Sequence, residues 1–175
     1  MLQTKIKSAI RDVQDFPKEG ILFKDITPIL EDSRLCSEII DEFVRRFADT
    51  KLNAIVGVES RGFLFGMMLA NKLGVPFIPV RKKGKLPYKT ISYKYDLEYG
   101  SAEVEMHIDA VKKGWQVLVH DDLLATGGTA MAAAELIQKQ GASVAGFAFL
   151  VGLDFLKGEE KIAPYSKNIV SLVTY

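Results

Sequence analysis

The fold of this chain is decided by the stretch Val117-Leu-Val-His-Asp-Asp-Leu-Leu-Ala-Thr-Gly-Gly-Thr129. A short apolar run, typical of a strand buried on both faces, ends in two adjacent carboxylates, Asp121 and Asp122. A loop of small residues follows and opens a helix over 129–140. Ligands of open α/β sheets bind beyond the carboxyl ends of the strands. The stretch therefore predicts a binding site at this end of a sheet.

The loop Thr126-Gly127-Gly128-Thr129 has the chemistry of an anion site. Backbone N–H groups and hydroxyls at a helix N-terminus bind phosphate, and glycines let the backbone approach it closely. Asp121 and Asp122 would repel a phosphate but suit sugar hydroxyls or a hydrated Mg²⁺. Together these residues predict a cradle for ribose 5-phosphate. The alternative is a capped helix after a glycine-rich turn, with both acids merely solvated.

Strands and helices alternate on both sides of this stretch. We expect a helix from Ile6 that ends near Asp15 and Pro17, and a second that starts at Asp32-Ser33 and reaches Phe47. Further strands are expected at 54–58, 76–80, 143–153 and 168–174, and a further helix at 63–73, capped by Gly74. This order predicts an α/β fold with a mostly parallel sheet flanked by helices. Residues 1–30 are expected to form a small N-terminal hood.

An antiparallel hairpin is expected at 91–97 and 102–108, around Glu98-Tyr-Gly-Ser101. Its second arm alternates, which predicts one buried and one solvated face. The solvated face comprises Glu103, Glu105, His107 and Asp109. The hairpin follows a basic, non-core segment, Arg81 to Pro87, and the two together predict a mobile lid over about 81–101. A solvated loop and a nucleic-acid patch are the alternatives for the basic segment.

Composition limits the classes of protein. The 175 residues predict one domain, 1–175, and 23 basic against 22 acidic side chains leave a net charge of +1. A nucleic-acid partner usually requires a basic excess, so none is expected. Cys36 is the only cysteine, which favours a reducing cytoplasm. No apolar run approaches the roughly 20 residues that span a bilayer, so no membrane partner is expected.

A second anion site is indicated by Glu59-Ser60-Arg61-Gly62, which joins an expected strand to an expected helix. Arg61 supplies a fixed cation suited to pyrophosphate. The alternative is an arginine paired with Glu59 at the helix start. No His/Cys cluster has metal-site spacing, so zinc is not expected.

Five motifs carry a family resemblance: FPKEGILFKDITPIL (16–30), VESRGFLFG (58–66), RKKGKLP (81–87), LEYGSAE (97–103) and DDLLATGGT (121–129). In this order they resemble the type I phosphoribosyltransferases, and the last is similar to that of members that use adenine. The resemblance implies the type I phosphoribosyltransferase fold and a Mg²⁺-dependent purine salvage reaction. Adenine and 5-phosphoribosyl-1-pyrophosphate would give AMP and pyrophosphate. It also implies a homodimer and a cis peptide between Glu59 and Ser60.

The resemblance also assigns site residues. Ribose 5-phosphate and AMP would be bound by Asp121, Asp122, Ala125, Thr126, Gly127, Gly128 and Thr129; pyrophosphate by Glu59, Ser60, Arg61, Arg81, Lys82 and Lys85; and adenine by Leu22, Phe23, Lys24 and Leu123. Glu98, beside Tyr99, would be the acid/base group at the purine, and Arg61 the second catalytic residue. Mg²⁺ would be held mainly by substrate and water, with no direct protein ligands.

Two departures from the family pattern concern individual residues. Lys24 stands where many relatives have arginine, and His120 where an aliphatic residue is usual. We expect His120 to be partly buried and without a role. Transferases of 6-oxopurines carry an acid where Ala125 stands, which favours adenine. Two alternatives stay open: a transferase for another purine base, and a non-catalytic regulator that senses phosphoribosyl pyrophosphate.

Overall fold

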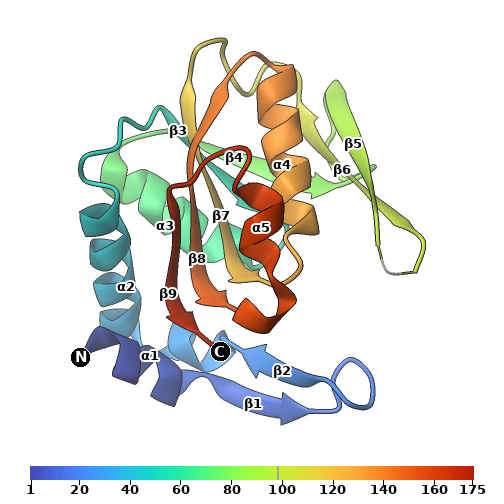
Figure 1. The fold of residues 1–175 in the computed structure, drawn as a ribbon. Coiled ribbons are helices and arrows are strands. Elements are labelled where there is room, and N and C mark those ends of the chain that lie inside the picture. The colour runs from blue at the N-terminus through green and yellow to red at the C-terminus, as the bar shows by residue number, and fades with distance from the viewer. Residues whose placement is uncertain (98) are drawn as a thin grey trace.

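The computed structural model describes residues 1–97 and 99–175 (Figure 1). Its strands are β1 (Arg11–Gln14), β2 (Leu22–Asp25), β3 (Ala54–Val58), β4 (Phe77–Lys82), β5 (Thr90–Asp96), β6 (Ser101–His107), β7 (Gln116–Leu124), β8 (Ser143–Gly152) and β9 (Ile169–Thr174). Its helices are α1 (Leu2–Ala9), η1 (Thr27–Glu31), α2 (Ser33–Arg46), α3 (Gly62–Leu73), α4 (Gly128–Lys139), η2 (Asp154–Leu156) and α5 (Gly158–Ile162), of which η1 and η2 are 3₁₀ helices.

The central sheet has seven strands in the order β5-β6-β4-β3-β7-β8-β9. Neighbours from β4 to β9 in this order are parallel, whereas β6 pairs antiparallel with both β4 and β5. β1 and β2 form a separate antiparallel ribbon. The predicted α/β fold, with a mostly parallel sheet and an attached antiparallel hairpin, is confirmed.

Each face of the sheet has its own hydrophobic core. Val117 and Val119 of β7 pack in the core covered by α4 and α5, while Leu118 packs in the core covered by α1, α2 and α3. A parallel strand covered on both faces reads as a continuous apolar run, as β3 and the first half of β7 do. The strands that lead to the predicted site are therefore packed on both faces.

The predicted second and third helices are confirmed. The Asp32 carboxylate caps α2 by accepting the N–H groups of Arg34 and Leu35, both at 3.0 Å. Gly74 ends α3 with a φ of +66°, a conformation that a side chain disfavours.

The prediction of a first helix up to Asp15 is wrong in its second half. α1 ends at Ala9, Ile10 is extended, and Arg11–Gln14 pair with Leu22–Asp25 as β1 and β2. The spacing of Ile6, Ile10 and Val13 fits a helix, but the ladder with a strand about ten residues downstream overrides that local preference.

The predicted solvated face of β6 is wrong at Glu105. Val104 and Met106 are buried as expected, but Glu105 is also buried, with 4% of its surface exposed. Its carboxylate accepts hydrogen bonds from Thr90 of β5 and from the segment that joins β4 to β5, which folds over this face. Ile108, expected on the buried face, is exposed, because β6 ends at His107 and the alternation ends with it.

Two short elements between β8 and β9, η2 and α5, have no counterpart in the sequence analysis, because helices of three and five residues are too short to show a period. Within 1–97 and 99–175, none of the helices has the length and apolar character needed to cross a membrane.

Candidate active site

Asp121 and Asp122 lie inside a strand rather than at its end. β7 stays paired with β8 as far as Leu124, opposite Gly152, because the parallel ladder continues beyond the apolar run. Asp122 is 2% exposed, so the alternative of two solvated acids is wrong. The backbone N–H of Asp122 donates to Oδ1 of Asp121 at 2.8 Å, which fixes the first carboxylate along the strand.

Burial raises the pKa of both acids, and that of Asp121 most strongly because it also faces the negative charge of Asp122. For Asp122, the Arg61 guanidinium opposes the effect of burial on the pKa. Adjacent carboxyls titrate as a coupled pair. A hydroxyl donor or a cation beside the two carboxyls would stabilise their ionised forms. The acid pair therefore suits a ligand that brings hydroxyl groups or a cation.

The segment 125–129, here called the phosphate loop, connects β7 to α4 as predicted. Gly127 has a φ of +81°, and a Cβ there would lie 2.6 Å from the carbonyl oxygen of Gly158, so only glycine fits. α4 starts at Gly128, and the N–H groups of a first helical turn have no acceptor inside the helix. The loop encloses a hollow of about 70 Å³, which is suited to an anion.

Arg61 lies in the turn between β3 and α3, and it pairs with Asp122 across the sheet. Its Nε lies 3.0 Å from Oδ2 of Asp122, so the alternative pairing with Glu59 is wrong. A Cβ on Gly62 would lie 3.0 Å from Oδ1 of Asp121, and this close approach brings the two loops together. The Glu59–Ser60 bond is cis, as the family resemblance implies.

Glu59 pairs instead with Arg81, at the end of β4. Nε and Nη2 of Arg81 donate to its two oxygens at 3.2 and 3.0 Å, and the backbone N–H of Lys82 donates at 3.0 Å. The Arg81 guanidinium holds the pKa of Glu59 below its ordinary value. The charge of Arg81 is thus largely neutralised by Glu59.

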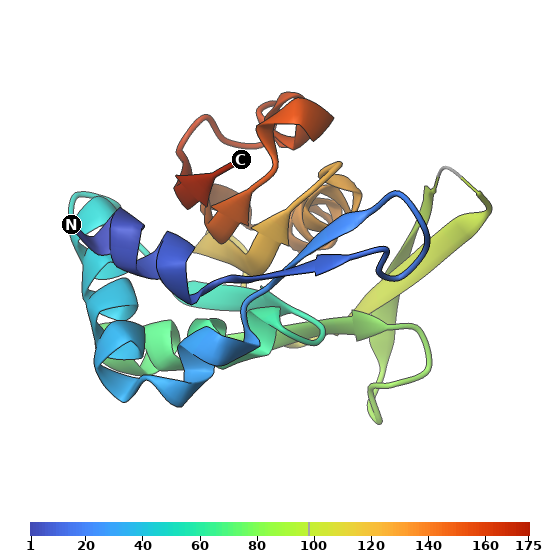
Figure 2. The same ribbon diagram turned by 90° about the horizontal axis from the view of Figure 1, so that it is seen from below.

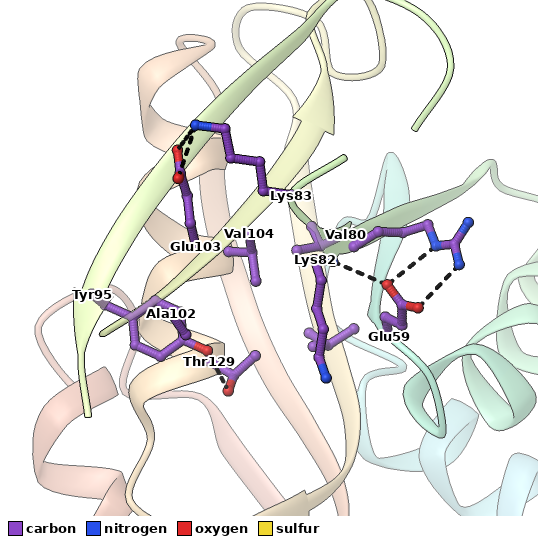
Figure 3. Close-up of a pocket in the computed structure, with 11 residues that line it drawn as sticks. Glu59, Val80, Lys82, Lys83, Tyr95, Ala102, Glu103, Val104 and Thr129 are labelled. Atoms are coloured by element: carbon purple, nitrogen blue, oxygen red, sulfur yellow. Dashed lines mark hydrogen bonds and ion pairs between the residues drawn. The ribbon is translucent and has the colours of Figure 1, made fainter. Parts of the chain in front are cut away.

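A pocket of about 430 Å³ opens between the turn at Glu59, the end of β4 and the hairpin. Figure 3 shows the Lys82 side chain pointing into this pocket, between Glu59 and Thr129. On the opposite wall the Tyr95 hydroxyl lies 3.2 Å from Oγ1 of Thr129, which joins the hairpin to the phosphate loop. The pocket therefore brings Lys82 close to Thr129, the last residue of the phosphate loop.

The ribbon β1–β2 approaches the same site through Phe23. The guanidinium carbon of Arg61 lies 5.0 Å from the centre of the Phe23 ring, and Phe16 packs edge-on against that ring, also at 5.0 Å. Lys24 points the other way: its Nζ lies 2.6 Å from Asp12 and 3.9 Å from the centre of the Tyr175 ring. Only the backbone of Lys24 thus remains available to a ligand beside Phe23.

Comparison with known proteins decides the family. Residues 24–174 match the model of the phosphoribosyl transferase domain, and this range contains the phosphate loop, the acid pair and both turns described above.

The chain belongs to the phosphoribosyl transferase family.

Relatives in this family match it over nearly its whole length. An adenine phosphoribosyltransferase of Cytophaga hutchinsonii is 50% identical over 175 residues, which cover 100% of this chain and 97% of the relative. An adenine phosphoribosyltransferase of Clostridium botulinum is 52% identical over 170 residues, covering 97% of this chain and 98% of the relative.

Solved structures of family members also superpose closely. Adenine phosphoribosyltransferase of Thermoanaerobacter pseudethanolicus has a TM-score of 0.96 and 47% identity, with 100% of both chains covered. The Saccharomyces cerevisiae enzyme, in complex with adenine and an imino-altritol bisphosphate, has a TM-score of 0.91 and 42% identity, with 98% of both chains covered.

The residues expected from the family pattern gather unevenly. Arg61, Asp121, Asp122 and the phosphate loop lie together at the carboxyl ends of β3 and β7. Leu22 is exposed on β2, and Leu123 is partly buried beside Asp122. Glu98 lies outside the described residues. Its neighbour Tyr99 is 80% exposed, and Lys18 of the ribbon turn lies 5.8 Å from the Tyr99 ring centre. Figure 2 shows this turn and strands β5 and β6 on the same side of the molecule.

His120 is fully buried, so the expectation of partial burial is wrong. It packs edge-on against Phe43 at 5.6 Å, and neither ring nitrogen has a hydrogen-bond partner in the described part of the chain. Burial lowers the pKa of His120 to about 4, so the ring is neutral. The expectation misjudged its depth because β7 stays in the sheet beyond the apolar run.

Sequence reasoning missed three residues that shape the site: Tyr95, Glu105 and Tyr175. Each lies outside the family motifs or on a strand face that the alternation assigned differently. Their partners are remote in sequence, so no local signal identifies them.

The described ranges contain no group of three or more His, Cys, Asp or Glu side chains arranged to hold a metal ion. The acid pair nevertheless fits a hydrated Mg²⁺, since carboxylate oxygens are its preferred protein partners. Oδ2 of Asp122, although ion-paired with Arg61, has no aligned hydrogen-bond donor.

Proposed function

We propose that the protein transfers the phosphoribosyl group of 5-phosphoribosyl-1-pyrophosphate to adenine, which yields AMP and pyrophosphate in purine salvage. The observation that carries this proposal is the contact between two loops, with Arg61 3.0 Å from Asp122 beside the phosphate loop. This arrangement, in a chain about 50% identical to adenine phosphoribosyltransferases, offers adjoining sites for a 5-phosphate, a ribose and a pyrophosphate.

The phosphate loop, residues 125–129, would bind the 5-phosphate with N–H groups and hydroxyls. Asp121 and Asp122 would accept hydrogen bonds from the ribose hydroxyls, and Arg61 would bind the pyrophosphate together with Ser60, Lys82 and Lys85. Glu59 and Arg81 would support this subsite through their ion pair. The anomeric carbon–oxygen bond breaks with its electron pair on pyrophosphate, and positive charge develops on the ribose. Fixed charges around that carbon stabilise the transition state without covalent catalysis.

Adenine would lie over Phe23, with Leu22 and Leu123 on its apolar sides, and backbone groups near Lys24 would bind its polar edge. The inward turn of the Lys24 side chain to Asp12 supports this use of the backbone. The purine nitrogen attacks the anomeric carbon and loses its proton. We assign the acceptor of that proton to Glu98, and Tyr99 to the lid that closes beside it, by the family resemblance.

We propose Mg²⁺ as the cofactor, held mainly by the substrate and water, with Asp121 and Asp122 near it. The cation supplies charge neutralisation for the leaving pyrophosphate. Burial raises the pKa of both acids, and a nearby cation would lower it again. Magnesium titration followed by turnover and by thermal stabilisation in the presence of pyrophosphate tests this assignment.

A homodimer is supported by one face of α3, on which Leu64, Met67 and Met68 are exposed. A contiguous apolar stripe of this kind is typical of an interface. Sedimentation of the wild type and of a Met67→Glu variant distinguishes a dimer from a monomer. A cytoplasmic location is supported by the single, buried, free Cys36, and cell fractionation tests it.

One folding unit, residues 1–175, is also proposed, with the hood over about 1–30 and the lid over about 81–101. Lys7 of α1 donates to the carbonyl oxygen of Thr174 at 2.9 Å, so the two ends of the chain support each other. Calorimetric unfolding should show a single cooperative transition, whereas two transitions would separate the hood from the sheet.

The decisive test is turnover with each purine base and the same phosphoribosyl donor. Adenine should be preferred over hypoxanthine and guanine by about 10³-fold or more in kcat/KM, because a site that hydrogen-bonds an amino group leaves a facing oxo group unpaired. Ala125 provides no acid for a 6-oxopurine ring. Comparable turnover of hypoxanthine would favour a transferase for another base, and binding of the donor without turnover of any base would favour a regulator.

A further inference from the structure

The segment that joins β4 to β5 begins with Lys83 at the wall of the pocket and carries Lys85, and a buried acid lies beneath it. Glu105 is 4% exposed, although it belongs to a strand arm whose alternation predicts a solvated side chain. An ionised carboxylate is buried only where other groups replace its water. The groups that surround Glu105 therefore indicate its role.

Three donors satisfy this carboxylate: two belong to the overlying segment, and the third is Thr90, the first residue of β5. Oε1 accepts the backbone N–H groups of Gly84 at 3.1 Å and Leu86 at 3.0 Å, and Oε2 accepts the hydroxyl of Thr90 at 3.2 Å. Burial by itself would raise the pKa of Glu105. The hydrogen bonds, led by those from the N–H groups of Leu86 and Gly84, outweigh burial and hold the pKa below its ordinary value, so the carboxyl is ionised.

The same segment also has a defined backbone turn. The N–H of Lys85 donates to the carbonyl oxygen of Lys82 at 3.2 Å, and Gly84 adopts a φ of +86°. Glu105 spans this turn from below, because its two backbone donors lie on either side of Lys85. The carboxylate thus holds the peptide groups between Lys82 and Leu86 in one arrangement.

Lys82 and Lys83 lie at the start of the turn, where β4 ends. Lys83 is directed to Glu103, with Nζ 2.9 Å from its carboxylate, while Lys82 points into the pocket (Figure 3). Neither Lys82 nor Lys85 forms an ion pair with any residue of 1–97 or 99–175. Lys82 lines the pocket, so its charge remains available to an anion there, whereas Lys85 lies on the turn and is not among the lining residues.

We propose that Glu105 is a positioning residue that holds the turn 82–86 in the conformation that binds pyrophosphate. It does not touch the substrate; it acts through the backbone of Gly84 and Leu86. This inference rests on the proposed function for the identity of the anion, whereas the ordering of the turn is independent of it.

Two isosteric or truncating variants test the proposal. Glu105→Gln keeps a carbonyl oxygen for both backbone N–H groups and an amide that can donate to the Thr90 hydroxyl, so it should bind magnesium pyrophosphate within about threefold of wild type. Glu105→Ala removes all three bonds and should weaken this binding by roughly tenfold or more, with the KM for adenine nearly unchanged. Glu38→Gln, on the surface of α2, is the matched control.

Limited trypsin digestion reports on the turn without any substrate. Cleavage after Lys83 and Lys85 should accelerate about tenfold in Glu105→Ala and stay at the wild-type rate in Glu105→Gln. If Glu105→Ala fails to fold, Gly84→Pro disturbs the exposed turn directly, since proline has no N–H and cannot adopt this φ. With the core intact, it should weaken the binding of magnesium pyrophosphate and accelerate cleavage after Lys85. Cleavage after Lys83 is not a readout in this variant, because trypsin does not cut a Lys–Pro bond.

Wild-type pyrophosphate binding in Glu105→Ala or in Gly84→Pro would overturn the proposal, as would loss of binding in Glu105→Gln. A protein that turns over no purine yet shows the predicted cleavage pattern would refute the proposed function and leave the ordering role of Glu105 in place. A cleavage pattern that is unchanged in Glu105→Ala, in an enzyme that turns over adenine, would support the proposed function and refute the ordering role of Glu105.

Discussion

In the floor of the site, formed by the turn 59–61 and the segment 121–129, each functional side chain projects from a buried strand or from the turn directly after it. In the cover, formed by the ribbon 11–25 and the segment 81–101, the functional groups are held by side chains from remote parts of the chain. Asp122 belongs to β7 itself, whereas Lys24 depends on Asp12 and Tyr175.

The difference follows from what anchors each part. The floor inherits its geometry from parallel strand pairing, such as Val56 opposite Val119, which continues to the site. In the cover, β1 and β2 form a separate ribbon, and β5 is the edge strand that pairs only with β6. Single side-chain contacts such as Tyr95 to Thr129 therefore join the cover to the floor. Changes in the floor should therefore abolish the reaction, and most changes in the cover should alter one substrate's binding.

The largest effect is expected for Arg61→Ala. It removes the cation at the pyrophosphate and leaves Asp122 buried without its partner, so kcat/KM should fall about 10³-fold. Steady-state kinetics checks this, with Arg45→Ala on the surface of α2 as the control. A loss of less than tenfold would contradict the importance of the floor.

Glu98→Ala is expected to be the exception among the cover residues. If Glu98 accepts the purine proton, kcat should fall about 10²-fold, while the KM for the phosphoribosyl donor changes little. Glu98→Gln should retain part of the activity only if the role is hydrogen bonding. Glu38→Ala is a suitable control; Glu105→Ala is not, because Glu105 is buried. Normal turnover in Glu98→Ala would reduce Glu98 to a turn residue.

His120→Leu probes the apolar backing of the floor. With a pKa of about 4 in the folded state and about 6.5 in the unfolded chain, His120 binds a proton on unfolding between these pH values. The free energy of unfolding therefore decreases as the pH falls, by about 2 kcal/mol at pH 5. The leucine variant should lack this decrease.

Chemical denaturation of the wild type and of His120→Leu at pH 5 and pH 7.5 measures the effect. Both proteins contain Asp121 and Asp122, so the contribution of this acid pair cancels in the comparison. Turnover at pH 7.5 should stay within a few-fold of wild type. Equal pH dependence of the two proteins, or a tenfold loss of turnover at unchanged stability, would show that His120 has another role.

The smallest effect is expected for Lys24→Met in the cover. Loss of the contacts to Asp12 and the Tyr175 ring should loosen β2 beside Phe23 and raise the KM for adenine about threefold to tenfold. The KM for the phosphoribosyl donor should not change. Lys5→Met, which removes an exposed ion pair, is the control, and a change in the KM of the donor alone would contradict the division of the site.

The predictability of the site follows the same division. The acid pair and the arginine turn could be located from sequence because each closely follows a buried apolar run, and the phosphate loop because its small residues open a helix. The partner of Arg61 could not be located, since Glu59 is adjacent in sequence while Asp122 is adjacent only across the sheet. The burial of Glu105 was missed because alternation describes a strand and not the segment that folds over it.

The sequence by itself determined the α/β order of elements, the family motifs and the chemical types gathered at the strand ends. Apolar runs and glycine-rich turns act over a few residues, so their consequences are legible locally. Only the tertiary structure decided which charges pair, that Arg11–Gln14 form a strand, and that Glu105 lies beneath the basic turn. These outcomes depend on the pairing of distant segments, where the free energy of burial and hydrogen bonding exceeds local preference.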